Sequence, residues 1–415
     1  MPEILIMGAG AAGLMAALFA GRAGARVTVL ERNEKPGKKI YITGKGHCNC
    51  TNDCEREDFL REVPRNPRFL YSALSGFTPQ DLMGLLESAG CPVEVQRGRR
   101  VFPRSMKASD VTAALVSLCR QAGVRFRMNA RAAELRTEAG DPRRVRGIVL
   151  EDGQELEADR VLLATGGLSY PATGSTGDGY RLARQAGHTV TALLPSLIGL
   201  ESGETWPASL QGLSLRNVRV TLRSGKKVLY TELGEMLFTH FGFSGPLILE
   251  ASCHLPEGWP GAAEIALELD LKPGLTPEQL DARLRRDLEA GGRKQLRNVL
   301  PGLMPASLAE LFPALCGLPE DLPCNQVTGA QRAALGRALK GLALPVRERR
   351  PMAEAVVTRG GIPVREVNPG TMESRLVRGL YFAGELLDVD AHTGGYNLQI
   401  AFSTGALAGK SAAGE

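Results

Sequence analysis

A chain of 415 residues is longer than one hydrophobic core usually supports, so two domains or one domain with a large insertion are expected. The net charge of +5 is spread over short clusters such as 97–100 and 347–350, and only 5% of residues are aromatic, which argues against a nucleic-acid stacking surface. A mean hydropathy of -0.09 and the lack of an apolar run of about 18 residues argue against a membrane span. With no signal peptide before the first predicted strand, we expect a cytoplasmic protein with small anionic ligands.

The first 31 residues have the pattern of a nucleotide-binding βαβ unit. A short apolar strand (4–7) precedes a helix from about Ala11 to Ala23, and a second strand follows at 27–30. Three glycines with G-x-G-x-x-G spacing join the first strand to the helix: Gly8, Gly10 and Gly13. Such glycines permit a tight turn, close approach of the backbone to a pyrophosphate, and close packing of the helix on the sheet. Glu31 follows near the spacing of roughly 20 expected for a carboxylate that binds ribose hydroxyls.

The remainder of residues 1–190 also has mixed α/β character. A helix is predicted over 110–123 and a strand over 124–128. Two strands at 144–150 and 154–159 form a predicted hairpin, since an Asp-Gly pair stands between them. A strand beginning at Arg160 ends in Thr-Gly-Gly, small residues that allow a second stretch of backbone to approach a cofactor.

The centre of the chain interrupts this domain. Short alternating segments predict a β-rich insertion over 191–274, and helical signals predict a small helical subdomain over 275–345. Two capping-box patterns, Thr276 with Gln279 and Thr328 with Gln331, mark helix starts there. From 346 to 415 the chain returns to strands, including 379–385, and to a final helix over 398–408.

The expected fold class is therefore α/β, with a split Rossmann-like FAD-binding domain, an inserted β-rich domain and a small helical subdomain. A contiguous N-terminal unit satisfies NAD, whereas FAD is longer and commonly needs a C-terminal segment for the ribityl chain and flavin. The split favours FAD.

Eight cysteines are expected to be reduced thiols, because disulfides are rare in the cytoplasm. Cys48, Cys50 and Cys54 are close enough in sequence to raise a metal or iron–sulfur site. No CxxC pair or matching His/Cys set recurs at ligand spacing, so we expect no metal.

Four segments carry a family resemblance: 37–52, 238–246, 381–390 and 394–401. On these motifs the chain resembles the bacterial NAD(P)/FAD-dependent oxidoreductases, a family that includes aminoacetone oxidase-like and bile-acid 3-dehydro Δ4,6-reductase-like flavoproteins. The resemblance spans nearly the whole chain. The family's loop usually reads GGGRCN, and Lys45 and His47 here replace a glycine and the arginine, so no role of that arginine is carried over.

The resemblance implies an FAD site built from both ends of the chain. Glu385 is suited to hydrogen-bond ribityl hydroxyls, with a solvated glutamate as the alternative, and Gly394 and Gly395 precede a helix whose dipole would face the flavin N1–C2 edge. Asn397 is either part of this site or an ordinary N-cap. The expected cofactor-binding residues are Gly8, Gly10, Ala11, Ala12, Gly13, Glu31, Arg32, Lys38, Thr43, Gly44, Gly46, Cys48, Asn49, Ala132, Thr165, Gly166, Gly384, Glu385, Gly394, Gly395, Asn397 and Leu398.

The leading functional interpretation is NAD(P)H-dependent reduction of an activated C=C bond in a steroid-like or other planar apolar substrate. Only one dinucleotide fingerprint is visible, so NADH or NADPH would dock transiently at the flavin. Tyr41, His47, His240 and Tyr396 are candidate proton donors, and each is also explained as a packed residue. The alternatives are a flavin amine oxidase acting on a small amine such as aminoacetone, and a flavin-dependent RNA-modifying or RNA-binding protein, which the scattered charge argues against.

Overall fold

The computed structural model describes residues 1–140, 143–260 and 265–415, and it divides into two compact units. Unit 1 comprises Met1–Ser196 and Pro351–Glu415, and unit 2 comprises Leu197–Arg350. These limits lie a few residues from those expected from sequence, 190 and 346. Residues 141–142 and 261–264, which belong to the predicted domain spans, lie outside the described residues.

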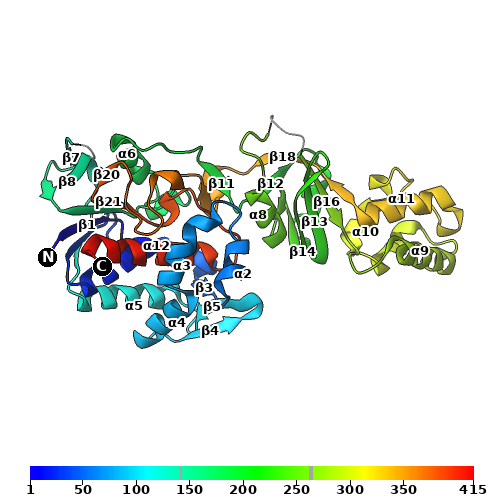
Figure 1. The fold of residues 1–415 in the computed structure, drawn as a ribbon. Helices are drawn as coiled ribbons and strands as arrows, with labels where there is room; N and C mark the ends of the chain where they lie inside the picture. Colours follow the sequence, from blue (N-terminus) through cyan, green and yellow to red (C-terminus); the bar gives the residue numbers. More distant parts are fainter. Residues whose placement is uncertain (141–142, 261–264) are drawn as a thin grey trace. The chain divides into compact units, whose positions relative to one another are not determined.

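Unit 1 contains a five-stranded parallel sheet, which confirms the Rossmann-like expectation (Figure 1). In spatial order its strands are β21 (Leu380–Phe382), β10 (Arg160–Leu163), β1 (Glu3–Met7), β2 (Arg26–Leu30) and β6 (Arg125–Arg127). Strand β21 comes from the far end of the chain, and Val161 of β10 lies opposite Leu380. The three adjacent strands β21, β10 and β1 are mostly apolar and buried, as is typical of parallel strands covered on both faces.

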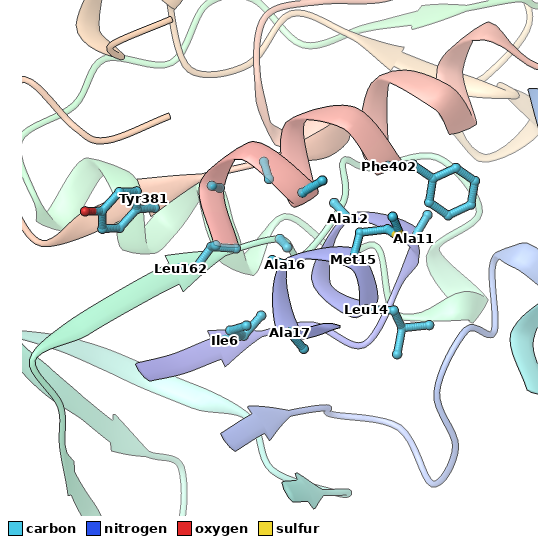
Figure 2. Packing of buried hydrophobic residues seen from close by; sticks show 14 of the residues in the cluster. Ile6, Ala11, Ala12, Leu14, Met15, Ala16, Ala17, Leu162, Tyr381 and Phe402 are labelled. Carbon is cyan, nitrogen blue, oxygen red and sulfur yellow. The ribbon is translucent and has the colours of Figure 1, made fainter. Parts of the chain in front are cut away.

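Two helices that are distant in sequence pack closely in unit 1: α1 (Ala11–Arg22) and α12 (Tyr396–Ala413). A Cβ on Gly405 would lie 2.3 Å from the Ala12 carbonyl oxygen, and one on Gly409 would lie 2.2 Å from that of Ala16. Figure 2 shows Ala12 and Ala16 in one buried cluster with Leu162 of the sheet. Small residues on both helices therefore permit the close approach.

Helix α12 is longer than the sequence predicted. The expected helix ran over 398–408, whereas the structure extends it over Tyr396–Ala413. Glycines lower helix propensity, so Gly405 and Gly409 weakened the sequence signal. Packing against α1 overrides that local cost.

The other elements of unit 1 surround this core. The helix predicted over 110–123 is confirmed as α5 (Ala108–Gln121), and the predicted hairpin is confirmed as β8 (Arg143–Leu150) with β9 (Glu155–Glu157). The remaining named helices and strands are β3 (Thr51–Asn52), α2 (Arg56–Arg61), α3 (Tyr71–Gly76), α4 (Pro79–Ser88), β4 (Val93–Gln96), β5 (Arg100–Pro103), β7 (Ala132–Glu138), α6 (Asp178–Gln185), β11 (Leu194–Ser196), β19 (Val357–Arg359) and β20 (Val377–Arg378).

Unit 2 combines an antiparallel sheet with helices around one continuous hydrophobic core. In spatial order the strands are β17 (Leu342–Leu344), β16 (Ile265–Asp270), β13 (Ser214–Ser224), β14 (Lys227–Thr239), β15 (Gly242–Ser244), β12 (Leu200–Ser202) and β18 (Val346–Arg349). The helices are α7 (Trp206–Ser209), α8 (Pro246–Cys253), α9 (Pro277–Gly291), α10 (Ala306–Leu315) and α11 (Gly329–Lys340). Both predicted capping boxes are confirmed, at the starts of α9 and α11.

Within the described ranges, no helix has both the length and the apolar composition that crossing a bilayer requires.

Candidate cofactor site

The three glycines between β1 and α1 have different surroundings. Gly8 has φ +97°, and a Cβ there would lie 2.6 Å from the carbonyl oxygen of Ala164, while a Cβ on Gly13 would lie 1.8 Å from the carbonyl oxygen of Gly8. At Gly10 no described neighbour would come within 4 Å of an added Cβ. Gly8 and Gly13 are thus needed for packing, and Gly10 faces open space where a ligand can approach the backbone.

The N-terminus of α1 presents backbone donors beside this loop. Leu14 N donates to Gly10 O at 2.9 Å, so the N–H groups of Ala11, Ala12 and Gly13 have no acceptor inside the helix. These donors and the positive end of the helix dipole suit a phosphate group.

Glu31 lies immediately after β2 and is only 6% exposed. Its carboxylate accepts hydrogen bonds from Ala9 N at 2.8 Å, from Asn33 N at 2.9 Å and from Asn33 Nδ2 at 2.7 Å. A carboxylate offers about four acceptor sites, so it can still accept from a ribose hydroxyl. The ribose role stays a prediction.

The carboxyl ends of β10 and β21 lie next to each other in the sheet, and both lead into glycines. Gly166 has φ +72° and Gly384 has φ +73°, and a Cβ on Gly384 would lie 2.8 Å from the Cβ of Ala12. Thr165 Oγ1 is buried without a hydrogen-bond partner among the described residues. Ligands of open α/β sheets bind at this carboxyl edge.

Glu385 follows Gly384 and belongs to a charged cluster. Lys39 Nζ lies 2.5 Å from Glu385 Oε2, while Ser169 Oγ and Thr358 N donate to Oε1 at 2.7 and 2.8 Å. Burial raises the pKa of this carboxyl, but the charge and hydrogen bonds of Lys39, with those of Ser169 and Thr358, bring the pKa below its usual value. Glu385 is therefore ionised and fixed by the protein, and its contact with the ribityl chain stays a prediction.

Five of the expected cofactor-binding residues lie in the loop 40–49, here called the flavin loop, which begins with the short 3₁₀ segment η1 (Ile40–Gly46), in which Gly44 has φ +56°. A Cβ on Gly44 would lie 2.9 Å from Asn49 N, and Thr43 Oγ1 donates to Ile40 O at 2.7 Å. Gly46, at φ +89°, ends the segment. Asn49 Oδ1 is buried and has no hydrogen-bond partner among the described residues. This loop therefore offers a buried acceptor to which a ligand could donate a hydrogen bond.

Cys48 and Cys50 are fully buried at the end of the same loop, with their sulfur atoms 3.7 Å apart. The hydrogen bond from Cys50 lowers the pKa of the Cys48 thiol. Cys54 is also buried, and burial raises its pKa to about 11. Among the described residues no cluster of three or more His, Cys, Asp or Glu side chains has an arrangement that could hold a metal ion.

The start of α12 meets this region through two glycines. Gly395 has φ +100°, and a Cβ there would lie 2.4 Å from the carbonyl oxygen of Thr51. Asn52 Nδ2 donates to Gly394 O at 3.2 Å. The segment after the flavin loop and the C-terminal helix are thus brought together, as the two-ended cofactor site requires.

Asn397 is not an N-cap, which corrects that alternative. The N-cap of α12 is Gly395, whose lack of a side chain leaves the position uncapped. The Asn397 side chain instead accepts from Ala391 N at 3.0 Å and donates to Ala391 O and His392 O at 2.7 and 3.2 Å. It fixes the loop before the helix, and the half-buried Leu398 follows it.

Three further predicted cofactor residues have contacts within the protein. Arg32 Nη1 lies 3.1 Å from Asp178 Oδ2, and Lys38 Nζ lies 2.7 Å from Glu34 Oε2. Ala132 is buried at the start of β7. Their contact with FAD stays a prediction.

Two candidate proton donors belong to the flavin loop. The Tyr41 ring has Lys35 Nζ 4.9 Å from its centroid. His47 is exposed, and its Nδ1 lies 2.9 Å from the carbonyl oxygen of Met106.

The other two candidates lie in different units. Tyr396 begins α12 in unit 1 and packs edge-on against Phe59, with ring centroids 5.0 Å apart. His240 is exposed in the turn between β14 and β15 of unit 2. The structure therefore brings three of the four candidates into the unit that carries the glycine loop.

Sequence reasoning missed Lys39, Ser169 and Thr358. Thr358 Oγ1 accepts from the backbone N–H of Ser169 at 3.1 Å and so joins the return strand to the loop after β10. The available signal was the pair that follows it, Gly360 and Gly361, with φ +89° and +147°. Adjacent glycines where the chain re-enters unit 1 indicate close backbone packing.

These features fit an elongated, phosphate-containing cofactor. The space at Gly10 is open, and Asn49, Thr51 and Thr165 keep buried polar atoms without partners among the described residues. The glycine loop would hold the pyrophosphate and Glu31 the ribose, and FAD supplies two-electron chemistry when bound.

Comparison with known proteins agrees with this assignment. The chain is 34% identical to a 3-dehydro-bile acid delta(4,6)-reductase of Clostridium scindens, over 100% of this chain and 99% of that protein. It is 31% identical to a ribosomal RNA dihydrouridine synthase of Escherichia coli, over 97% of this chain and 96% of that protein. A 3-ketosteroid-delta4-(5alpha)-dehydrogenase of Rhodococcus jostii RHA1, solved with 4-androstene-3,17-dione, shares the fold with a TM-score of 0.54 at 17% identity, covering 100% of this chain and 97% of that one.

The split Rossmann sheet, its cofactor cradle and these similarities define an FAD-dependent oxidoreductase. The family model described as HI0933-like protein Rossmann domain matches residues 2–411. The chain belongs to this HI0933-like family of FAD-binding proteins, which confirms the resemblance drawn from its motifs.

Proposed function

We propose that this flavoprotein reduces a C=C bond conjugated to a carbonyl group in a steroid-like or other planar apolar substrate, with NADH or NADPH as a transient donor. The observation that carries the proposal is the likeness to the bile-acid reductase along the entire chain. The second relative supports the same chemistry, because forming dihydrouridine also adds hydrogen across a ring C=C bond conjugated to a carbonyl. A cytoplasmic location belongs to this proposal, since the nicotinamide donors are found there.

One of the two basic clusters named above, 347–350, favours a small molecule over RNA. In unit 2, Arg347 Nη2 and Arg350 Nη1 lie 2.5 and 2.7 Å from the two carboxylate oxygens of Glu201, and the Arg349 guanidinium lies over the Trp259 ring at 5.3 Å. The basic cluster at 347–350 is thus engaged within its own unit. Phosphate recognition needs cationic groups that can face the nucleic acid.

The protein's own groups have three tasks in this proposal. The glycine loop and the α1 N-terminus bind the pyrophosphate, and Glu385 orients the ribityl chain. The backbone donors at the start of α12 favour negative charge on the flavin. Tyr41, His47, Tyr396 or His240 delivers the proton to the substrate carbon.

Anaerobic mixing tests the donor. Rapid bleaching of the flavin by NADH or NADPH, followed by recovery on adding a 3-oxo-Δ4,6 steroid, is expected. Bleaching by aminoacetone alone, with peroxide formed in air, would establish the amine oxidase instead.

The RNA alternative is favoured by the likeness to the dihydrouridine synthase and is tested in the same experiment. Unmodified ribosomal RNA replaces the steroid, and dihydrouridine is measured after digestion. Flavin recovery with RNA but not with steroid would replace the proposed substrate class and keep the C=C chemistry. The variants Tyr41→Phe, His47→Gln, His240→Gln and Tyr396→Phe then show which residue delivers the proton. Loss of the proton donor slows reoxidation of the flavin by the substrate, while reduction of the flavin by NADH or NADPH persists.

A further inference from the structure

Lys39 joins parts of unit 1 that are far apart in sequence. Its Nζ lies 2.5 Å from Glu385 Oε2 and 2.6 Å from Ser169 Oγ, and the same carboxylate accepts from Thr358 N at 2.8 Å. The four residues come from the loop before η1, the loop after β10, the return strand β19, and the short segment that follows β21. One ammonium group therefore ties the flavin loop to the carboxyl edge of the sheet.

Both charged side chains are largely withdrawn from water, with exposures of 23% for Lys39 and 18% for Glu385. A charge in such a place is costly unless a partner of opposite sign and hydrogen bonds compensate it. Tyr180 also packs here and donates its hydroxyl to the Glu385 carbonyl oxygen at 3.3 Å. Within the described part of this cluster, Lys39 is the cation that faces the carboxylate.

We propose that Lys39 is a positioning residue for FAD: it aims the Glu385 carboxylate at the ribityl chain and neutralises its charge. A lone carboxylate beside the cofactor would oppose flavin reduction, because reduction adds negative charge to the ring system. The inference rests on FAD as the cofactor and is independent of the proposed substrate.

Charge compensation predicts opposite shifts in the flavin midpoint potential. Lys39→Met leaves the carboxylate uncompensated and lowers the potential, whereas Glu385→Gln leaves the ammonium uncompensated and raises it. The double variant returns the potential close to that of the wild type. Measurement at about pH 8.5 keeps a carboxyl that has lost its lysine largely ionised.

Binding of FAD to the apoprotein gives an independent readout. Each single variant is expected to weaken FAD binding about tenfold or more, since each leaves one charge unpaired in a poorly hydrated place. Lys39→Arg keeps the positive charge, so its midpoint potential is expected to stay closer to that of the wild type than the potential of Lys39→Met. Lys107→Met, which removes an exposed lysine of the same unit, is the matched control and is expected to shift the potential little.

The proposal would be overturned if the midpoint potential shifted in the same direction in both single variants. It would also be overturned if the potential of the double variant differed from the wild type by as much as that of the more strongly shifted single variant. Should Lys39→Met fail to fold, Glu385→Gln and the double variant carry the test. An unchanged potential in Glu385→Gln would then show that Lys39 and Glu385 serve packing alone.

Discussion

Gly13 lies so close to Gly8 that a Cβ on Gly13 would stand 1.8 Å from the Gly8 carbonyl oxygen. The contact brings the first turn of α1 onto the end of β1. Gly10, between them, has no described atom within 4 Å of such a Cβ. One glycine motif thus contains a packing position and a ligand-facing position, and substitutions separate the two.

Gly13→Ala is expected to destabilise the apoprotein by about 1–3 kcal/mol, because the methyl group overpacks a rigid backbone contact. Gly10→Ala is expected to leave the apoprotein's stability nearly unchanged and to weaken FAD binding, since its methyl group would stand where the pyrophosphate approaches. Urea unfolding of the apoproteins and FAD titration measure the two effects. Equal stability losses in both variants would contradict this division of roles.

Asn397→Ala is expected to lower stability by about 1–3 kcal/mol, because backbone groups of Ala391 and His392 lose their side-chain partner in a half-buried loop. FAD binding weakens as well, since this loop leads into the glycines before α12. Thermal unfolding with and without FAD measures both. Asn298→Ala, at an exposed position, is the control and is expected to change stability little. A loss of stability in Asn397→Ala no larger than that of the control would contradict the prediction.

His188 is expected to make stability depend on pH. Its Nδ1 lies 2.9 Å from Glu366 Oε2 and its Nε2 2.8 Å from Ser374 Oγ, and burial, the largest influence, lowers its pKa despite the nearby carboxylate. The unfolded chain therefore takes up a proton below about pH 6.5 that the folded chain does not, at up to about 1.4 kcal/mol per pH unit.

Stability should thus fall between pH 7.5 and 5.5 more steeply in the wild type than in His188→Gln. The pKa of Glu366 is also lowered, against the effect of burial, by its hydrogen bonds from Thr189 and His188, so its contribution to stability is lost only as the pH falls below the usual carboxyl pKa of 4.5, outside this window. Urea unfolding at several pH values gives the two slopes. Identical slopes would show that His188 is not the group responsible.

Cys316 is expected to be the first thiol to react with Ellman's reagent in the folded protein. Among the described cysteines it alone is not fully buried, and burial raises its pKa to about 11. Its reaction should be slow near pH 8 and accelerate with rising pH, because the thiolate is the nucleophile. Cys119, whose pKa burial raises to about 12, should react after unfolding. Cys316→Ser should remove the early phase, and an unchanged early phase would contradict the assignment.

Local patterns were enough to predict much of the fold. The glycine spacing before α1 and the capping boxes at Thr276 and Thr328 depend on residues three to five positions apart, and all three are confirmed. The chain-end motifs also predicted that β21 and α12 complete the nucleotide-binding domain. Nothing local, however, showed that α12 would continue past 408, because its glycines are compensated only by contact with α1.

The sequence alone determined the class of cofactor and the elements that surround it, since strand, helix and turn signals are short-range properties of the chain. Only the tertiary structure decided that Lys39 meets Glu385 and that Ser169 joins them. That outcome depends on side chains brought together from segments remote in sequence. Burial and charge pairing select it once the chain has folded, so no local pattern encodes it.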